Sequence, residues 1–354
     1  MQLVINTYGT SLRRRGERFV ISHRSRPQPI ELAASKVQSV VIASSIHLTS
    51  GVIELAAQHD IDICFLSKDG QPYSRVWQSR LGSTAAIRRA QLCAADDDVG
   101  AATVSQWIAK KLENQQRFLT QLQSKRPQGT DAFDTALRLL PDTVQKLLQL
   151  SGTVTEKRAS IMGLEGAAGR VYFECLSKLM PSEYPFSGRS RRPAVDPFNA
   201  MLNYAYGVLY SQVERAQILA GLDPQIGFLH TDNYNKRSLV FDMIEPFRII
   251  AEKSTVLLFT GRRVKREFFR EVPGGIELAP EGRAALIANL NERLDKAVKY
   301  PIQQPKRPGG KKTRRIKLRV TIQYEAHALA NQLLGRCDLP RIVDSDSLFE
   351  NDDG

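Results

Sequence analysis

Short hydrophobic runs, separated by turn-forming residues, fill the first part of the chain. The runs cover residues 3–5, 18–21, 37–42 and 61–66, and Gly, Pro, Ser or Asp separates them. Alternating and β-branched runs of this length are typical of β-strands. Asp69-Gly70 is a turn signal between two such strands. One helix is expected to interrupt the strands at residues 50–58.

The pattern changes to a helical period after Gly82. Hydrophobic residues then recur at the spacing of one helix face. Helices are expected over residues 84–94, 102–123, 131–150, 153–180, 196–220, 238–259 and 280–299. The chain is therefore predicted to be an α+β protein, with a small N-terminal β-strand domain followed by a larger all-α catalytic domain. We place the β-rich domain at 1–85, the helical domain at 86–335 and an acidic tail at 336–354.

Charge narrows the choice of partner. The 354 residues include 50 Lys and Arg against 37 Asp and Glu, a formal net charge of +13. Such an excess of positive charge favours a polyanionic partner, although a ribosomal or membrane-surface contact would explain the same net charge. The four cysteines form no CxxC pair and read as reduced thiols. With neither a signal peptide nor an apolar run of about 18 residues, a cytoplasmic protein is expected, with no membrane partner.

One short segment, residues 227–248, gathers residues that can hold a metal. His230 ends a short apolar run, and Asp242 and Glu245 follow three residues apart. That spacing places both carboxylates on one face of a helix, which Ser238 could cap and Pro246 could kink. A structural histidine and a solvated acidic face would explain the same residues.

A further carboxylate, Glu165, lies in the small-residue run GLEGAAG. Glycine in a helix costs about 1 kcal/mol per residue, so three glycines in one helix need a compensating benefit. They allow another backbone or a phosphodiester strand to approach closely, and Glu165 could then reach a metal. The alternative is a tight helix–helix contact with Glu165 directed to water.

One histidine and several carboxylates in a basic chain suggest phosphodiester chemistry on a nucleic acid. An imidazole ligand favours Mn2+ over Mg2+, although either fits the oxygen ligands. Neither a GxSxG turn nor a GxxxxGK[ST] phosphate loop occurs, which argues against a serine hydrolase or an ATPase.

Basic residues cluster in two loops and in one run over residues 306–319. They could follow a phosphate backbone, or form an ordinary solvated surface. The candidates for DNA contacts are Arg189, Arg191, Arg192, Lys236, Arg237, Lys311, Lys312, Arg314 and Arg315.

Several blocks together resemble a known family, the CRISPR-associated endonuclease/integrase of the spacer-acquisition (adaptation) complex. The blocks are residues 9–21, Gly70-Gln71-Pro72 with Arg75, Arg88-Arg89-Ala90-Gln91, GLEGAAGRVYF, DPFNAMLNYAYGVLY and GFLH with SLVFDMIEPFR. They extend over most of the chain, and the last three together are highly specific.

The resemblance implies a site and a reaction. Carried over by motif, the metal ligands are Glu165, His230 and Glu245, with Asp242 beside the metal in a supporting role. Many relatives have Asp at the position of Glu245, and the longer side chain could change the metal geometry. The implied activity is a metal-dependent DNA endonuclease/integrase, using Mg2+ or Mn2+, that inserts short DNA duplexes into a CRISPR array by transesterification from DNA 3′-hydroxyls.

The resemblance also implies partners. These are double-stranded DNA (a captured spacer precursor and the CRISPR repeat), a second copy of the chain in a homodimer, and a small ferredoxin-like adaptation protein. Two other readings stay open: a non-catalytic DNA-binding subunit, and a general metal-dependent repair nuclease.

Overall fold

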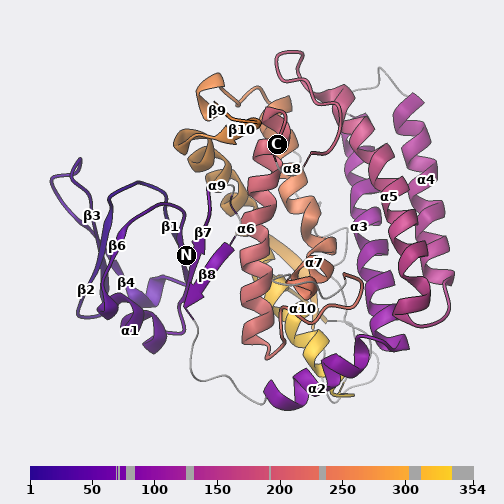
Figure 1. The fold of residues 1–354 in the computed structure, drawn as a ribbon, viewed down its shortest axis with the longest axis horizontal. Helices are drawn as coiled ribbons and strands as arrows, with labels where there is room; N and C mark the ends of the chain where they lie inside the picture. The colour runs from indigo at the N-terminus through magenta and orange to yellow at the C-terminus, as the bar shows by residue number, and fades with distance from the viewer. Residues whose placement is uncertain are drawn as a thin grey trace.

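The computed structural model places a small β-rich unit beside a larger helical domain (Figure 1). It describes residues 1–68, 70, 72–76, 84–124, 131–190, 193–230, 237–302 and 312–336. The expected α+β fold class, a strand-rich N-terminal part before a mostly helical part, is confirmed. No helix in these ranges is long and apolar enough to cross a membrane.

Two four-stranded sheets and one helix form the N-terminal unit. The first sheet has the order β1 (Gln2–Ile5), β5 (Ser39–Ile42), β7 (Asp62–Leu66) and β8 (Pro72–Val76). The second has the order β4 (Ile30–Ala33), β3 (Arg18–Ser22), β2 (Ser11–Arg15) and β6 (His47–Leu48). Helix α1 (Ser50–Gln58) occupies the expected residues. Side chains such as Leu12, Phe19 and Leu55 form a core between these elements.

The helical domain is built around long helices that pack side by side. Helices α3 (Asp98–Ser124), α4 (Asp131–Gln149) and α5 (Val154–Leu179) form one group, on the right in Figure 1. Helix α6 (Pro197–Leu219) runs through the middle of the molecule and packs on α8 (Arg248–Thr260), α9 (Pro280–Leu294) and α10 (Leu318–Leu333). Helix α2 (Thr84–Ala94) begins after the gap that follows β8.

Local sequence signals explain where the central helices begin. Thr153 and Glu156 form a capping box at α5, in which Glu156 Oε2 accepts from the Thr153 amide at 2.8 Å. Asp196 caps α6 by accepting from the Asn199 amide at 2.7 Å, with Pro197 at the first helical position. Both caps fix the residue at which each helix begins.

The expected helix over 238–259 is wrong as a single element. The structure has α7 (Ser238–Met243), a 3-10 turn η2 (Glu245–Phe247) and then α8. Pro246 has no amide hydrogen to continue the α-helical pattern, and its carbonyl accepts from Asn114 of α3 at 2.9 Å. Arg237 is the N-cap residue and its side chain makes no capping hydrogen bond, so the prediction that Ser238 caps the helix is wrong: Ser238 is the first residue of α7.

The second domain is not all-α. It contains a hairpin of β9 (Phe269–Val272) with β10 (Gly275–Leu278) and another of β11 (Ala297–Ile302) with β12 (Lys312–Lys317). Residues 297–299, expected to be helical, lie in β11 because α9 ends at Leu294. The expected acidic tail lies outside the described residues except for Arg336, which directly follows a turn after α10.

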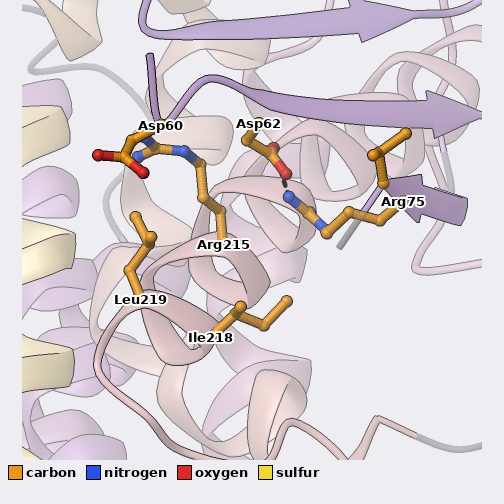
Figure 2. A pocket seen from close by; sticks show the side chains of 7 residues that line it. Asp60, Asp62, Arg75, Arg215, Ile218 and Leu219 are labelled. Atoms are coloured by element: carbon orange, nitrogen blue, oxygen red, sulfur yellow. Dashed lines mark ion pairs between the residues drawn. The ribbon is translucent and has the colours of Figure 1, made fainter. Parts of the chain in front are cut away.

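Buried ion pairs between side chains connect the β-rich unit to the helical domain. Arg75 of β8 forms an ion pair with Asp62 of β7 (Figure 2). It also reaches across to Glu214 of α6 at 2.9 Å. Arg75 and Asp62 border a small hollow that Asp60, Arg215, Ile218 and Leu219 also line. Gly207 of α6 lies against the Gly70 carbonyl, where a Cβ would come within 2.1 Å of the oxygen. The hollow shares no residue with the site described next.

Candidate metal centre

Two predicted site carboxylates meet on one lysine. The ammonium of Lys111, from the middle of α3, forms ion pairs with Glu165 of α5 and with Glu245 of η2, the latter at 2.8 Å. The side chains of Lys111 and Glu245 are each 7% exposed, and that of Glu165 is 35% exposed. Burial alone would lower the pKa of Lys111, but the two carboxylates raise it, so the ammonium stays charged.

Glu245 is held by a second cation on its other oxygen. Arg248 donates from Nε to Glu245 Oε1 at 2.9 Å, whereas Lys111 lies next to Oε2. Burial alone would raise the pKa of Glu245, but Arg248 and Lys111 together lower it to about 2. Glu245 is therefore an ionised carboxylate throughout the physiological range.

An aromatic platform supports Arg248. The guanidinium lies 4.8 Å from the centre of the Tyr206 ring, within the range of a cation–π contact. The Tyr206 hydroxyl donates in turn to Glu252 at 2.7 Å, and Gln115 of α3 also contacts this buried carboxylate. Tyr206 of α6, which is itself hydrogen-bonded to Glu252 of α8, therefore holds the Arg248 guanidinium in place.

Asp242 accepts several hydrogen bonds from the chain segment that ends at His230. Its carboxylate accepts from three successive backbone amides, those of Phe228, Leu229 and His230, at 2.6, 3.0 and 3.1 Å. Its Oδ1 also lies 2.6 Å from His230 Nδ1. When Nδ1 is engaged in this way, the other ring nitrogen, Nε2, is the one left for a ligand or a proton.

Asp242 and Glu245 serve different neighbours. The predicted shared helix face is wrong, because Glu245 lies beyond the end of α7, in the 3-10 turn. Asp242 is directed to the segment that ends in His230, and Glu245 to Lys111 and Arg248. The two environments remain close enough for the charge of His230 to contribute to the low pKa of Glu245.

The glycines around Glu165 face open space. A Cβ built at Gly163, Gly166 or Gly169 would meet no described atom within 4 Å. The alternative of a tight contact between helices within the chain is therefore wrong for these positions among the described residues. Glu165 lies on a bare and accessible stretch of α5.

The side chains of Glu165, His230 and Glu245 are of the kinds that bind a divalent cation, but their present positions are not those of a metal site. No group of three His, Cys, Asp or Glu side chains among the described residues is arranged to hold a metal ion. However, Glu245 Oε2 is buried and makes no hydrogen bond with the described atoms, although the Lys111 ammonium is close. Two carboxylates already share one cation, and an oriented imidazole is nearby. This donor set suits Mn2+ or Mg2+.

The basic candidates fall into three groups. Arg189 donates to Asn203 at 2.8 Å and also bonds Asn199, and Arg237 forms an ion pair with Glu214 at 3.1 Å. Arg314 and Arg315 are exposed on β12, and the backbone of Lys312 lies on the same strand. Arg191, Arg192, Lys236 and Lys311 lie outside the described residues.

Four residues of the centre were not among the predicted site residues: Lys111, Arg248, Tyr206 and Glu252. Arg248 and Tyr206 fall inside motif blocks already singled out, so their place beside the acids was an available signal. Lys111 has no such signal. It is one of two adjacent lysines in a long amphipathic helix, and only the packing of α3 against α5 and η2 brings it to the acids.

Structural similarity defines the class of the fold. The structure of a casposase bound to its integration product superposes with a TM-score of 0.80 at 23% identity, covering 98% of this chain and 95% of the casposase chain. A CAS1 protein from Thermotoga maritima gives 0.75 at 19% identity, covering 97% of this chain and 100% of that chain. The two-part fold is thus one shared by a casposase and a CAS1 protein.

Sequence similarity then identifies the family. The model of CRISPR associated protein Cas1 matches residues 3–292. A CRISPR-associated endonuclease Cas1 of Rhodospirillum rubrum is 30% identical over 344 residues, which cover 94% of this chain and 95% of the relative. Another, of Archaeoglobus fulgidus, is 30% identical over 312 residues, 85% of this chain and 90% of the relative. The chain belongs to the Cas1 family.

Proposed function

We propose that the chain is a metal-dependent DNA endonuclease/integrase that inserts short DNA duplexes into a CRISPR array. The observation that carries this proposal is the meeting of Glu165 and Glu245 on one cation beside the oriented imidazole of His230. Family membership supports it, since the Cas1 relatives are named endonucleases.

Glu165, His230 and Glu245 would hold the Mg2+ or Mn2+. When bound, the ion supplies charge stabilisation to a phosphodiester under attack. Glu245 arrives ionised, because Arg248 and Lys111 keep its pKa low. Asp242 holds His230 Nδ1 and so presents Nε2, which makes Asp242 a positioning residue rather than a ligand.

The proposed transfer exchanges one phosphodiester for another. The 3′-oxygen of the captured DNA forms a bond to a phosphorus of the target strand, and the bond from that phosphorus to the target's own 3′-oxygen breaks. The attacking hydroxyl loses a proton to solvent and the departing 3′-oxygen gains one. Attack by water in place of the hydroxyl gives endonuclease cleavage at the same site, with no covalent bond to the protein.

The proposed complex contains double-stranded DNA, a second copy of the chain and a small ferredoxin-like adaptation protein. A neighbour with a TM-score of 0.76 and 20% identity is described as a Cas6-RT-Cas1--Cas2 complex; it covers 97% of this chain and 36% of that chain. The exposed Arg314 and Arg315 of β12 are candidates for phosphate contacts. We place this assembly in the cytoplasm.

Single alanine substitutions test the site. Glu165→Ala, His230→Ala and Glu245→Ala should each reduce integration of a labelled duplex into repeat DNA to background, because each removes a proposed ligand. Binding of the duplex should remain largely intact. Glu113→Ala is a matched control, since this acid of α3 pairs with Lys110 instead. Wild-type integration in any of the three site variants would refute the site.

The products separate the remaining readings. A non-catalytic DNA-binding subunit would bind duplexes with the same salt dependence but give no strand-transfer product in Mn2+. A general repair nuclease would cut branched DNA of any sequence as readily as repeat DNA. Metal-dependent joining of the duplex to a CRISPR repeat, in preference to unrelated DNA, is the result that our proposal requires.

A further inference from the structure

The ammonium of Lys111 lies where it contacts both proposed acidic ligands. It pairs with Glu165 from one side and with Glu245 Oε2, at 2.8 Å, from the other. These acids come from α5 and η2, so the lysine of α3 links three elements at one point. A cation between two carboxylates uses the same oxygens that a divalent ion would need.

The local charges balance with Lys111 in place. Two carboxylates, Glu165 and Glu245, face two cations, Lys111 and Arg248. A divalent ion added to these four groups leaves two positive charges in excess, which the carboxylate of Asp242 behind His230 offsets only in part. Repulsion is weakly screened where Lys111, Arg248 and Glu245 are buried. One cation therefore has to withdraw, at least in part, for the ion to bind well.

The geometry decides which cation withdraws. Arg248 bonds Glu245 Oε1 and stacks on Tyr206, with Tyr210 also at its Nη1 at 3.4 Å. Lys111 contacts the other oxygen, Oε2, which makes no hydrogen bond with the described atoms. A lysine also has a flexible stem and a single charged group, whereas a stacked guanidinium is held in its plane.

We infer that Lys111 is a built-in competitor of the metal, whose ammonium must leave at least one of the two carboxylates before a divalent ion binds to both. This inference rests on the proposed function and adds a residue that limits metal affinity. Lys111 is thereby a specificity-determining residue, because an ion that binds weakly to oxygen ligands cannot displace it.

Metal titration of the purified full-length chain, without DNA, tests the inference. Mn2+ binding is measured by the loss of the free-ion electron paramagnetic resonance signal in wild type, Lys111→Met and Lys111→Arg. Removing the Lys111 charge in Lys111→Met should lower the Kd for Mn2+ about tenfold. This is the lower end of the change in metal affinity that groups next to the ligands usually cause. Lys111→Arg keeps the charge and should not tighten binding. Lys110→Met, the adjacent lysine that pairs with Glu113, is the matched control.

Thermal unfolding gives a second readout. Lys111→Met should melt below wild type without metal, because two carboxylates lose their shared cation, and Mn2+ should raise its Tm more than that of wild type. If Lys111→Met folds only in the presence of Mn2+, this also supports the inference. If it does not fold under either condition, Lys111→Gln replaces it in the same titration.

The outcomes distinguish the two proposals. If wild type binds Mn2+ and Lys111→Met binds no tighter, the competitor role is overturned while the proposed metal site stands. If neither protein binds Mn2+, both are overturned. Loss of binding in Glu165→Ala and Glu245→Ala, together with tighter binding in Lys111→Met, supports both.

Discussion

At the residue scale, the candidate centre depends on the pairing of each Glu245 oxygen with a different cation. Glu245 is ionised because Arg248 holds Oε1 and Lys111 lies at Oε2. Arg248 in turn depends on Tyr206, whose ring supports the guanidinium and whose hydroxyl bonds Glu252. Tyr206 thus has two functions that separate substitutions can isolate.

Tyr206→Phe and Tyr206→Leu should have different effects. The first removes only the hydroxyl, so Glu252 loses its 2.7 Å donor and keeps Gln115. This should cost about 1–3 kcal/mol of unfolding free energy while Mn2+ affinity stays near wild type. The second also removes the ring beneath Arg248 and should weaken Mn2+ binding further. Urea unfolding and metal titration measure the two effects. Equal Mn2+ affinity in both variants would rule out the platform role of the ring.

At the element scale, the sequence predicts helices better than it predicts their junctions. The expected 84–94 matches α2, and 50–58 matches α1, because apolar spacing repeats over these lengths. Pro246 was predicted to kink one continuous helix, whereas the helix ends before it, and Asn114 of α3 binds its carbonyl. The strands β11 and β12 were not predicted, since they depend on pairing with each other across the chain.

The site residues show the same difference between what the sequence predicts and what depends on tertiary contacts. Glu165, His230, Asp242 and Glu245 stand out in the sequence, as carboxylates and imidazole within unusual motifs. Lys111 does not stand out, because a lysine in a helix is ordinary until tertiary packing brings acids to it. Arg248 and Tyr206 lie within the motif blocks, but the contact between them depends on the packing of α6 against α8.

Two helical glycines should respond oppositely to alanine. Gly166 faces open space, so Gly166→Ala should raise the unfolding free energy by up to about 1 kcal/mol through helix propensity alone. Gly207→Ala should destabilise the chain strongly, because the added Cβ would lie 2.1 Å from the Gly70 carbonyl oxygen. Urea unfolding of the two variants provides the comparison. Stabilisation of Gly207→Ala would show that α6 and the turn at Gly70 are not in close contact.

At the scale of the whole molecule, buried charges join the β-rich unit to the helical domain. Arg75 pairs with Asp62 in its own sheet and with Glu214 of α6, and the Arg75 side chain is 7% exposed. Buried ion pairs contribute little net stability, yet removal of one partner leaves the other charges unpaired. Arg75 therefore controls how firmly the two parts stay together.

Arg75→Met should lower the unfolding free energy by about 3–5 kcal/mol, because buried Asp62 loses its ion-pair partner and Glu214 keeps only Arg237. Arg15→Ala, which removes a surface pair with Glu31, should cost less than about 1 kcal/mol. Urea unfolding and limited proteolysis between β8 and α2 measure the loss of stability and of attachment. If Arg75→Met behaved like Arg15→Ala, the ion cluster would not be what joins the two parts.

The meeting of α3, α5 and η2 at one lysine has a consequence during synthesis. Lys111 and Glu165 are 54 positions apart, and the neighbouring contact from Asn114 to Pro246 joins residues 132 positions apart. Helices α3 to α5 can pack while the ribosome is still translating, since domains fold as they emerge. Glu245 arrives much later, so a nascent chain cannot complete the proposed centre until the segment through Arg248 has left the exit tunnel. Under the proposed function, a partly made chain therefore lacks one of the three residues that would hold the metal.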